Sequence, residues 1–261
     1  MALAGEQEVA VAGLIDKRVL VVGASSGIGR GIAAALAKAG AQVAVAGRRR
    51  PALDELCAEL PTTGLAVSCD VRRPDECDAV VAGTVEAFGG LDALVYAAGA
   101  SRLAPLSRTD ADAWHSILET NLVGASLVCR AALPHLRRSH GRAVFLGSSS
   151  VGRPFPGMCA YAASKVALEQ MVIGWRVENP DISFSTVRVG RTQGTDFASE
   201  WDQNLAAEMM AFWADNGYRP EGAVMDVDDV AEVVCSVLAM PASVHTMDVN
   251  GTNPDAEPAI Q

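Results

Sequence analysis

Lysine and aromatic residues are scarce in this sequence of 261 residues. There are three lysines against 18 arginines, and Phe, Trp and Tyr together make up 5% of the chain. Acidic side chains outnumber basic ones, and the net charge of −10 disfavours nucleic acid or an anionic membrane as a partner. The N-terminus carries Glu6 and Glu8 where a signal peptide needs positive charge, and no apolar run reaches membrane-spanning length. We therefore expect a cytoplasmic protein.

Paired cysteines of the kind that hold a metal are also absent. The six cysteines form no C-x-x-C pair and have no histidine at metal-ligand spacing; they are Cys57, Cys69, Cys77, Cys129, Cys159 and Cys235. We expect them to be reduced core residues, with no metal and no disulfide. The four histidines lie away from the carboxyl ends of the predicted strands, so none is placed to activate a serine nucleophile. This disfavours a serine hydrolase.

Half of the chain is apolar, which is enough to bury the core of one large α/β domain. Short runs typical of strands alternate with helical segments throughout. Strands are predicted at 18–22, 42–46, 65–68, 93–97, 142–147, 183–189 and 245–249, and the clearest helices at 74–88, 112–138 and 161–177. Several strands are continuously apolar, as in a sheet that is covered on both faces. The sequence therefore predicts an α/β fold with a doubly wound parallel sheet of about seven strands in a single domain.

The folded domain is expected to be flanked by two short segments. We expect an N-terminal extension at 1–13, the domain at 14–249 and a polar C-terminal tail at 250–261. Within the domain, residues 190–223 form a long connection whose large apolar residues include Trp201, Met209, Met210, Phe212, Trp213 and Tyr218. Such a connection either covers a partly apolar substrate or packs into the core, and the sequence leaves both open.

A cluster of glycines follows the first predicted strand in the stretch "VVGASSGIGRGIAAALAKAG". Gly23, Gly27 and Gly29 stand between that strand and a helix with one apolar face. Glycine is costly in regular structure, so the cluster indicates a tight turn or the close approach of another group. A turn from strand to helix also directs free backbone N–H groups and the positive end of the helix to one point. We interpret it as a phosphate-binding turn; the alternative is a tight turn without a ligand.

The stretch "YAASK" places Tyr161 and Lys165 four residues apart, on one face of a predicted helix. Lys165 is the only lysine after Lys38 in a chain that otherwise uses arginine, which favours a specific need for a compact ammonium group. A tyrosine is a poor base near neutral pH, and an adjacent cation lowers its pKa. We therefore expect the pair to carry acid–base chemistry, although a surface pair would have the same spacing.

Ser148 lies thirteen residues before Tyr161, at the end of the strand-like stretch "GRAVFLGS". A hydroxyl at this place can donate a hydrogen bond to a carbonyl oxygen as negative charge develops on it. Ligands of parallel α/β sheets bind beyond the carboxyl ends of the strands, so a site is expected here. Ser149 is the second choice for the same role, and a merely polar turn at 148–150 is the simpler alternative.

Five motifs, in order and at matching spacing, make the chain similar to the short-chain dehydrogenase/reductase family, single-domain type. They are "GASSGIG" at 23–29, "DV" at 70–71, "ETNLVGA" with Asn121, "GRAVFLGSSS" with Ser148, and "YAASK" with Tyr161 and Lys165. The resemblance covers nearly the whole chain, from about Leu14 to Val249. It implies a Rossmann fold, a nicotinamide cofactor and hydride transfer between an alcohol and a carbonyl group. It also implies a homo-oligomer, a tetramer or a dimer, built by pairing of the helices at 112–138 and 161–177.

The resemblance further implies roles for individual residues. The catalytic residues would be Asn121, Ser148, Tyr161 and Lys165. Tyr161 would be the general acid/base, and Ser148 would polarise the carbonyl group. Lys165 would hold the nicotinamide ribose and lower the tyrosine pKa, and Asn121 would position a water. The cofactor would be bound by Gly23, Ser25, Ser26, Gly27, Ile28, Gly29, Arg48, Asp70, Val71, Ala98, Gly99, Tyr161 and Lys165, with Asp70 and Val71 at the adenine.

Three stretches depart from the family pattern. Val22 replaces the usual threonine, "YAAG" at 96–99 replaces N-N-A-G, and "VRVGRTQGT" at 187–195 lacks the proline before Gly190. These departures concern cofactor affinity and loop geometry, not the reaction class. A catalytically silent dinucleotide-binding sensor or scaffold on the same fold is the alternative function. The longer epimerase/dehydratase branch shares Y-x-x-x-K, but it needs another glycine spacing and an extra C-terminal domain.

The end of the second predicted strand, "QVAVAGRRRP", distinguishes the two nicotinamide cofactors. A site for NAD(H) needs a carboxylate about 20 residues beyond the glycine turn, where it binds the ribose 2′-hydroxyl. Here Gly47 is followed by three arginines, and no acidic residue comes before Asp54. A guanidinium can bind a 2′-phosphate through two hydrogen bonds. We therefore expect NADP(H) in preference to NAD(H), with Arg48 as the contact; a solvated turn that caps the next helix is the alternative for Arg49 and Arg50.

Overall fold

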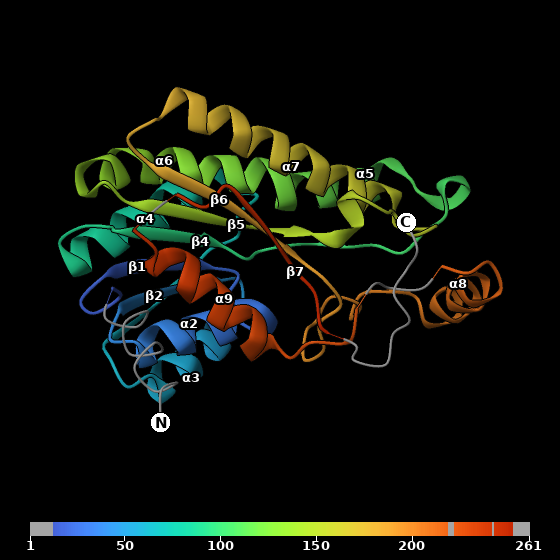
Figure 1. The fold of residues 1–261 in the computed structure, drawn as a ribbon, viewed down its shortest axis with the longest axis horizontal. Helices are drawn as coiled ribbons and strands as arrows, with labels where there is room; N and C mark the ends of the chain where they lie inside the picture. The colour runs from blue at the N-terminus through green and yellow to red at the C-terminus, as the bar shows by residue number, and fades with distance from the viewer. Residues whose placement is uncertain (1–12, 219–221, 242, 253–261) are drawn as a thin grey trace.

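The computed structural model describes residues 13–218, 222–241 and 243–252. Its centre is one parallel sheet of seven strands, which confirms the predicted single-domain Rossmann fold (Figure 1). The strands are β1 (Arg18–Val22), β2 (Gln42–Gly47), β3 (Gly64–Ser68), β4 (Ala93–Tyr96), β5 (Arg142–Ser148), β6 (Ser183–Val189) and β7 (Thr246–Val249). Their order is β3-β2-β1-β4-β5-β6-β7, so the winding direction reverses between β1 and β4. Ligands of such sheets bind at the carboxyl ends of the strands beside this reversal.

Helices cover both faces of the sheet (Figure 1). On one face lie α2 (Gly27–Lys38), α3 (Arg50–Glu59) and α9 (Val227–Ala239), and on the other lie α4 (Pro74–Phe88), α6 (Gly124–Ser139) and α7 (Cys159–Glu178). Strand β1 shows why its sequence is apolar throughout. Val19 and Val21 pack into one core, whereas Leu20 and Val22 pack into the other, and all four side chains are fully buried.

The long helix expected at 112–138 is interrupted in its middle. The structure has α5 (Ala111–Leu118), a π-helical segment (Glu119–Val123) and then α6. The prediction of one continuous α-helix is therefore wrong at this point. A π-helical turn is wider than an α-helical turn, and such turns are frequent at functional sites. In this case it carries Asn121, whose side chain bonds to the backbone of Ala100 in the segment after β4.

The same stretch, Ala111–Ser139, is long and apolar enough to cross a membrane by length and composition alone. Glu119 and Arg130 interrupt it, and α6 packs on α4 and the sheet through Val128, Leu136 and other buried residues. Core helices pass this test as well, so the finding is weak evidence for a membrane span.

The cysteines differ in burial. Cys69, Cys77 and Cys129 are buried as expected, and Cys57 and Cys235 are half-buried. Cys159 is exposed, so the expectation of a core residue is wrong there. It opens α7 on the solvent side of that helix, the side that also carries Val166. The predicted extension at 1–13 and the predicted tail at 250–261 lie mostly outside the described residues.

Candidate active site

A large cavity of about 950 Å³ opens at the carboxyl ends of the strands. It extends from the turn after β1, past the ends of β4 and β5, to the connection that follows β6. Every residue expected to bind the cofactor lines it: Gly23, Ser25, Ser26, Gly27, Ile28, Gly29, Arg48, Asp70, Val71, Ala98, Gly99, Tyr161 and Lys165. Of the expected catalytic residues, Ser148, Tyr161 and Lys165 line the cavity, whereas Asn121 lies behind its wall.

The turn from β1 to α2 requires glycine at two positions. Gly23 has a φ of +90°, and a Cβ there would lie 2.4 Å from the Ala98 nitrogen; a Cβ on Gly29 would lie 2.3 Å from the Gly23 oxygen. Helix α2 begins at Gly27 with no side-chain hydrogen bond at its N-cap and no acidic residue in its first turn. Its free N–H groups and positive end therefore face the cavity and fit the phosphates of a dinucleotide.

Asp70 lies beyond the end of β3, where the adenine contact is expected. Its carboxylate binds Arg72 at 2.5 Å, and this hydrogen bond holds the pKa of Asp70 below its usual value. Val71 is buried and packs close to Gly124, where a Cβ would lie 2.8 Å from that of Val71. Tight packing therefore fixes this wall of the cavity, and Asp70 stays ionised.

The three arginines after β2 have different surroundings. Arg50 pairs with Asp54 at 2.8 Å along α3, which is the solvated role considered for it. Arg48 lines the cavity as expected, and its guanidinium makes no ion pair within the described part of the chain. Arg49 also lines the cavity and donates to Ser25 Oγ (3.2 Å) and Ser26 Oγ (2.5 Å) of the glycine turn. Arg49 is therefore exposed at the start of α3, as in the solvated turn, and also contacts the glycine turn.

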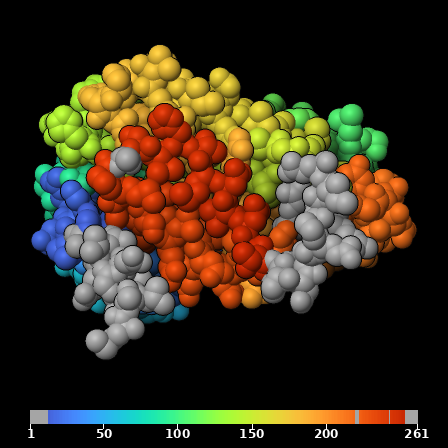
Figure 2. Space-filling view, viewed as in Figure 1, coloured from blue at the N-terminus to red at the C-terminus, as the bar shows by residue number. Residues whose placement is uncertain are grey.

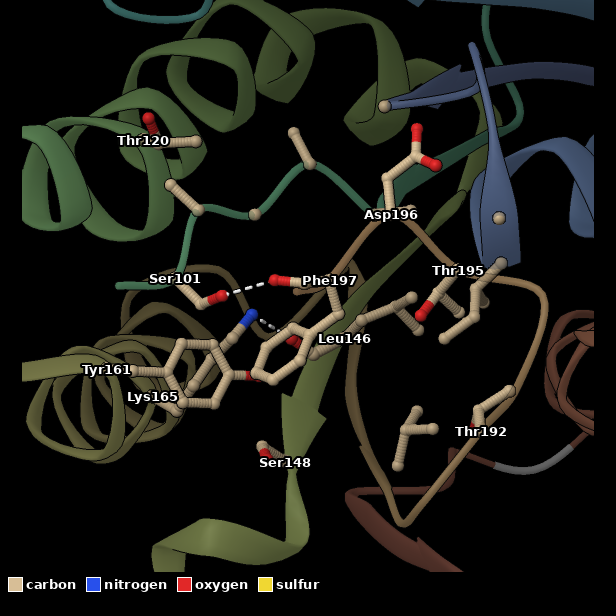
Figure 3. Close-up of a pocket in the computed structure, with 18 of the residues that line it drawn as sticks. Ser101, Thr120, Leu146, Ser148, Tyr161, Lys165, Thr192, Thr195, Asp196 and Phe197 are labelled. Atoms are coloured by element: carbon tan, nitrogen blue, oxygen red, sulfur yellow. Dashed lines mark hydrogen bonds between the residues drawn. The ribbon is translucent and has the colours of Figure 1, made fainter. Parts of the chain in front are cut away.

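Lys165 points from α7 into the cavity (Figure 3). Its ammonium group donates to the Leu146 carbonyl oxygen at 2.8 Å and lies 5.8 Å from the centre of the Tyr161 ring. The side chain is only 4% exposed. Burial lowers the pKa of Lys165 to about 8, although the charge of Glu169 acts in the opposite direction. The ammonium therefore titrates close to the working pH.

Tyr161 lies beside Lys165, but its pKa does not move in the expected direction. Burial raises the pKa of Tyr161 to about 12, and hydrogen bonding from Ser148 opposes this shift. The expected lowering by Lys165 is therefore not found, because removal of the phenol from water outweighs a cation 5.8 Å from the ring. Tyr161 keeps its proton across the neutral range.

Ser148 is the last residue of β5 and points into the same cavity (Figure 3). Its Oγ accepts hydrogen bonds from the nitrogen and the Oγ of Ser150, at 3.2 and 2.9 Å. Since Ser148 Oγ accepts both of these bonds, its own proton is left to be donated, either to Tyr161, whose pKa hydrogen bonding with Ser148 lowers, or to a ligand. Ser149 is exposed at the next position and lacks these contacts. The geometry supports Ser148 over Ser149 as the group that polarises a carbonyl.

Asn121 is fully buried and supports the cavity wall from behind. Its Oδ1 accepts from the Ala100 nitrogen at 2.7 Å, and its Nδ2 donates to the Ala100 oxygen and to Ser164 Oγ. The side-chain amide is thus engaged with the protein and does not reach the cavity. Its visible role is to hold the segment after β4 against α7.

Tyr96, the first residue of "YAAG", anchors the carboxyl end of β4. It is 1% exposed, and its hydroxyl donates to the Thr120 oxygen of the π-helical segment at 2.6 Å. A Cβ on Gly124 would lie 2.8 Å from this hydroxyl. Tyr96 therefore joins the end of β4 to the turn that carries Asn121, at the one place where only glycine leaves room for it.

The Tyr96→Phe variant is expected to lower the free energy of unfolding by about 1–2 kcal/mol, because the buried Thr120 carbonyl loses its donor. Urea denaturation should show a lower midpoint with an unchanged slope. An unchanged midpoint would show that this hydrogen bond contributes nothing to stability.

The substrate side of the cavity is aromatic. The connection after β6 contains α8 (Gln203–Asp215), and Trp201, Met210 and Trp213 line the cavity together with Tyr218. Met209 instead packs with Leu103, Met158 and Tyr161 in a small core. Trp201 and Trp213 also pack against this small core, so the connection both lines the cavity and packs inward.

Three residues of this site escaped the sequence analysis. The carboxylate of Asp196 pairs with Arg49 at 2.9 Å. The Phe197 ring lies edge-on to Tyr161 with 5.0 Å between ring centres, and its carbonyl oxygen accepts a hydrogen bond from Ser101 Oγ (Figure 3). The run of three arginines was the available signal for Arg49, but no local pattern marks its partner across the cavity.

Comparisons with a family model and with known proteins indicate the same family. The family model for short chain dehydrogenase matches residues 17–206. An 11-beta-hydroxysteroid dehydrogenase 1A of Arabidopsis thaliana is 36% identical over 207 residues, which is 75% of this chain but 59% of the plant protein. The chain thus spans between half and two thirds of the length of such relatives.

Solved structures agree along nearly the whole chain. A dehydrogenase/reductase from Sinorhizobium meliloti 1021 superposes with a TM-score of 0.81 at 27% identity, covering 95% of this chain and 98% of that one. An alcohol dehydrogenase from the archaeon Thermococcus sibiricus, complexed with 5-hydroxy-NADP, gives 0.75 at 26% identity and covers 93% and 98%.

Proposed function

The chain belongs to the short-chain dehydrogenase/reductase family, and from that premise we propose that it is an NADP(H)-dependent oxidoreductase acting on an alcohol/carbonyl pair. One observation carries the proposal: Ser148, Tyr161 and Lys165 come together in the cavity that also holds the glycine turn (Figure 3). A silent sensor would not need a serine hydroxyl, a phenol and a buried ammonium arranged around one open space.

The chain's own residues divide the acid–base work. When bound, the nicotinamide supplies or accepts the hydride. For reduction, Ser148 donates a hydrogen bond to the carbonyl oxygen, and Tyr161 gives its phenol proton to the same oxygen. The high pKa of Tyr161 keeps that proton in place until the oxygen becomes basic. Lys165 keeps one N–H on Leu146 and has two further donors for the ribose hydroxyls.

The choice of NADP(H) rests on the end of β2. Gly47 has no side chain, and the Ser25 hydroxyl lies in the adjacent space, so β2 itself ends without a carboxylate that could bind a ribose 2′-hydroxyl. Arg48 and Arg49 provide positive charge on the same wall. The structural relative from Thermococcus sibiricus, complexed with 5-hydroxy-NADP, is in accord with this choice.

The substrate is proposed to be partly apolar, since Phe155, Met210, Trp213 and Tyr218 line the outer cavity. A plant relative named as a hydroxysteroid dehydrogenase fits a bulky apolar alcohol. The test is NADPH oxidation with a panel of cyclic and long-chain ketones alongside small polar ketones. Turnover of apolar ketones supports the proposal. Turnover of small polar carbonyls alone contradicts the substrate class, and no turnover with any carbonyl or alcohol favours the sensor.

The pH profile of carbonyl reduction should reflect the titration of the Lys165 ammonium group. Its pKa of about 8 in the free protein means that the ammonium is charged below this pH and neutral above it. Tyr161, with a pKa near 12, stays protonated over the same range. We therefore expect kcat/KM for reduction to be level from about pH 6 to 7.5 and to fall above about pH 8.

The Glu169→Gln variant tests whether the titration of Lys165 causes this fall in kcat/KM. The Glu169 charge raises the pKa of Lys165, so its removal should move the fall in kcat/KM to lower pH. A profile that stays level to pH 10, or that does not move in the variant, would contradict the assignment to Lys165.

The protein is also proposed to be a homo-oligomer that pairs through α7. Val166, Ile173 and Val177 form an exposed apolar stripe on this helix, 45% to 80% open to solvent. Figures 1 and 2 show α7 along one edge of the molecule, with no described segment outside it. Contiguous apolar surface of this kind marks self-association sites.

Light scattering at micromolar concentration should give the mass of a dimer or tetramer, and Ile173→Glu should reduce it. Leu106→Glu, which changes an exposed leucine away from α7, is the matched control and should leave the mass unchanged. A wild-type monomer would exclude the interface.

A further inference from the structure

The segment 195–197 crosses the cavity from the glycine turn to the loop after β4. Thr195 lies against the turn, since a Cβ on Gly27 would lie 3.3 Å from its Cα. Asp196 pairs with Arg49 on the same side. Phe197 reaches the other side, where its carbonyl oxygen accepts a hydrogen bond from Ser101 and its ring lies edge-on to Tyr161 (Figure 3). One short piece of chain thus joins the nucleotide end of the cavity to the catalytic tyrosine.

Arg49 presents its hydrogen-bond donors toward an anion at this place. Its Nη2 donates to Asp196 Oδ2 at 2.9 Å and to Ser26 Oγ at 2.5 Å, and its Nε donates to Ser25 Oγ. Hydrogen bonding from Ser26, followed by that from Arg49, lowers the pKa of Asp196. The Asp196 carboxylate therefore sits where the Ser26 hydroxyl and the Arg49 guanidinium converge, next to the end of β2. A phosphate group would use the same donors.

We propose that Asp196 occupies, in the ligand-free protein, the anion position that the cofactor's 2′-phosphate takes on binding. The exchange frees Asp196 from Arg49 and releases segment 195–197, and with it Phe197, from Tyr161. Asp196 is then a specificity-determining residue: a nucleotide with a 2′-phosphate replaces its carboxylate, and one without it does not. This inference rests on the proposed function, because it assumes a nucleotide in the cavity.

The strength of the ion pair suits an exchange of this kind. The side chains of Arg49 and Asp196 are 55% and 53% exposed, and pairs this open to solvent are weakly held. A phosphate carries more charge and more acceptor oxygens than a carboxylate, so it outcompetes Asp196 for the guanidinium. Asp196 left beside a bound phosphate would be repelled by it, which drives the segment away from the turn.

Binding of adenosine 2′,5′-bisphosphate and of adenosine 5′-monophosphate, measured by calorimetry, isolates the 2′-phosphate from the nicotinamide. Asp196→Asn should bind the bisphosphate about 3- to 10-fold more tightly than wild type, because the competing charge is gone, and should bind the monophosphate within about twofold of wild type. Arg49→Gln should weaken the binding of the bisphosphate. Addition of Asp196→Asn to Arg49→Gln should not change this affinity further. Glu208→Gln is the control, because it removes an exposed carboxylate of α8 that pairs with Arg108. It should bind both nucleotides as wild type does.

Hydrogen–deuterium exchange gives an independent readout of the segment. The bisphosphate, but not the monophosphate, should increase exchange at 195–201 in wild type and not in Arg49→Gln. If wild type prefers the bisphosphate but Asp196→Asn does not tighten it, or the segment does not respond, this inference is wrong and the NADP(H) proposal stands. If wild type binds both nucleotides equally, the NADP(H) proposal itself fails.

Discussion

The Tyr161→Phe variant is expected to lose at least about 100-fold in kcat, equivalent to about 2.7 kcal/mol of transition-state stabilisation. The phenylalanine ring keeps the edge-on contact with Phe197 and fills the same space beside Lys165. It has no proton to give to the carbonyl oxygen and no group to receive the hydrogen bond from Ser148. The loss should therefore appear in the chemical step, measured as the single-turnover rate of NADPH oxidation with a ketone that wild type reduces.

The matched control is Tyr218→Phe. Tyr218 lines the outer part of the same cavity and stacks with Phe212 and beneath Arg153, away from Ser148 and Lys165. Its kcat should stay within about threefold of wild type, since no proton transfer depends on it. Circular dichroism and NADPH affinity should match wild type in both variants. A Tyr161→Phe enzyme with near-normal turnover would remove Tyr161 from the catalytic role.

Loss of Arg48 is expected to weaken NADPH binding by about 10- to 150-fold, corresponding to a charge-assisted hydrogen bond of about 1.5–3 kcal/mol. Arg48 lines the cavity directly after β2, and within the described residues no carboxylate pairs with it. Its guanidinium is thus available to a 2′-phosphate without first giving up a partner, in contrast to Arg49. NADH has no phosphate at this position, so its affinity should be nearly unchanged in Arg48→Ala.

Arg50→Ala provides the control for this measurement. Arg50 carries the same charge two positions later, but it pairs with Asp54 on α3 and does not line the cavity. Its removal should change the affinity for both cofactors by less than about twofold. Fluorescence titration of the three proteins with NADPH and NADH separates the cases. Equal weakening of both cofactors in Arg48→Ala, or equal affinity of wild type for both, would contradict the NADP(H) proposal.

Local sequence patterns were sufficient for most elements of the fold. The strands at 18–22 and 183–189 and the helix at 74–88 have the predicted bounds, because apolar runs and helical periodicity depend on residues a few positions apart. The prediction failed at the π-helical segment Glu119–Val123. Tertiary contacts surround that turn: Tyr96 bonds to Thr120 from β4, and Asn121 bonds to Ala100.

In the candidate site, too, local sequence patterns predicted some residues and tertiary contacts decided the others. The glycine turn, Ser148 and the pair Tyr161–Lys165 stand out in the sequence because each needs a particular residue type at a fixed spacing. The structure brings all of them to one cavity. The sequence gives the same alternative, a solvated turn, for Arg49 and Arg50, because identical neighbours in a run differ only in what they contact in three dimensions.

The sequence by itself determined the alternation of strands and helices and the family of the chain, because both follow from patterns and spacing along the chain. Only the tertiary structure decided which distant segments meet. Asp196 pairs with Arg49 across 147 positions, and no local pattern encodes such a contact. The tertiary structure also decided the protonation of the site. Tyr161 and Lys165 are adjacent on one helix face, but burial, not their proximity, raises the pKa of the first and lowers that of the second, because it is the fold that removes both groups from water.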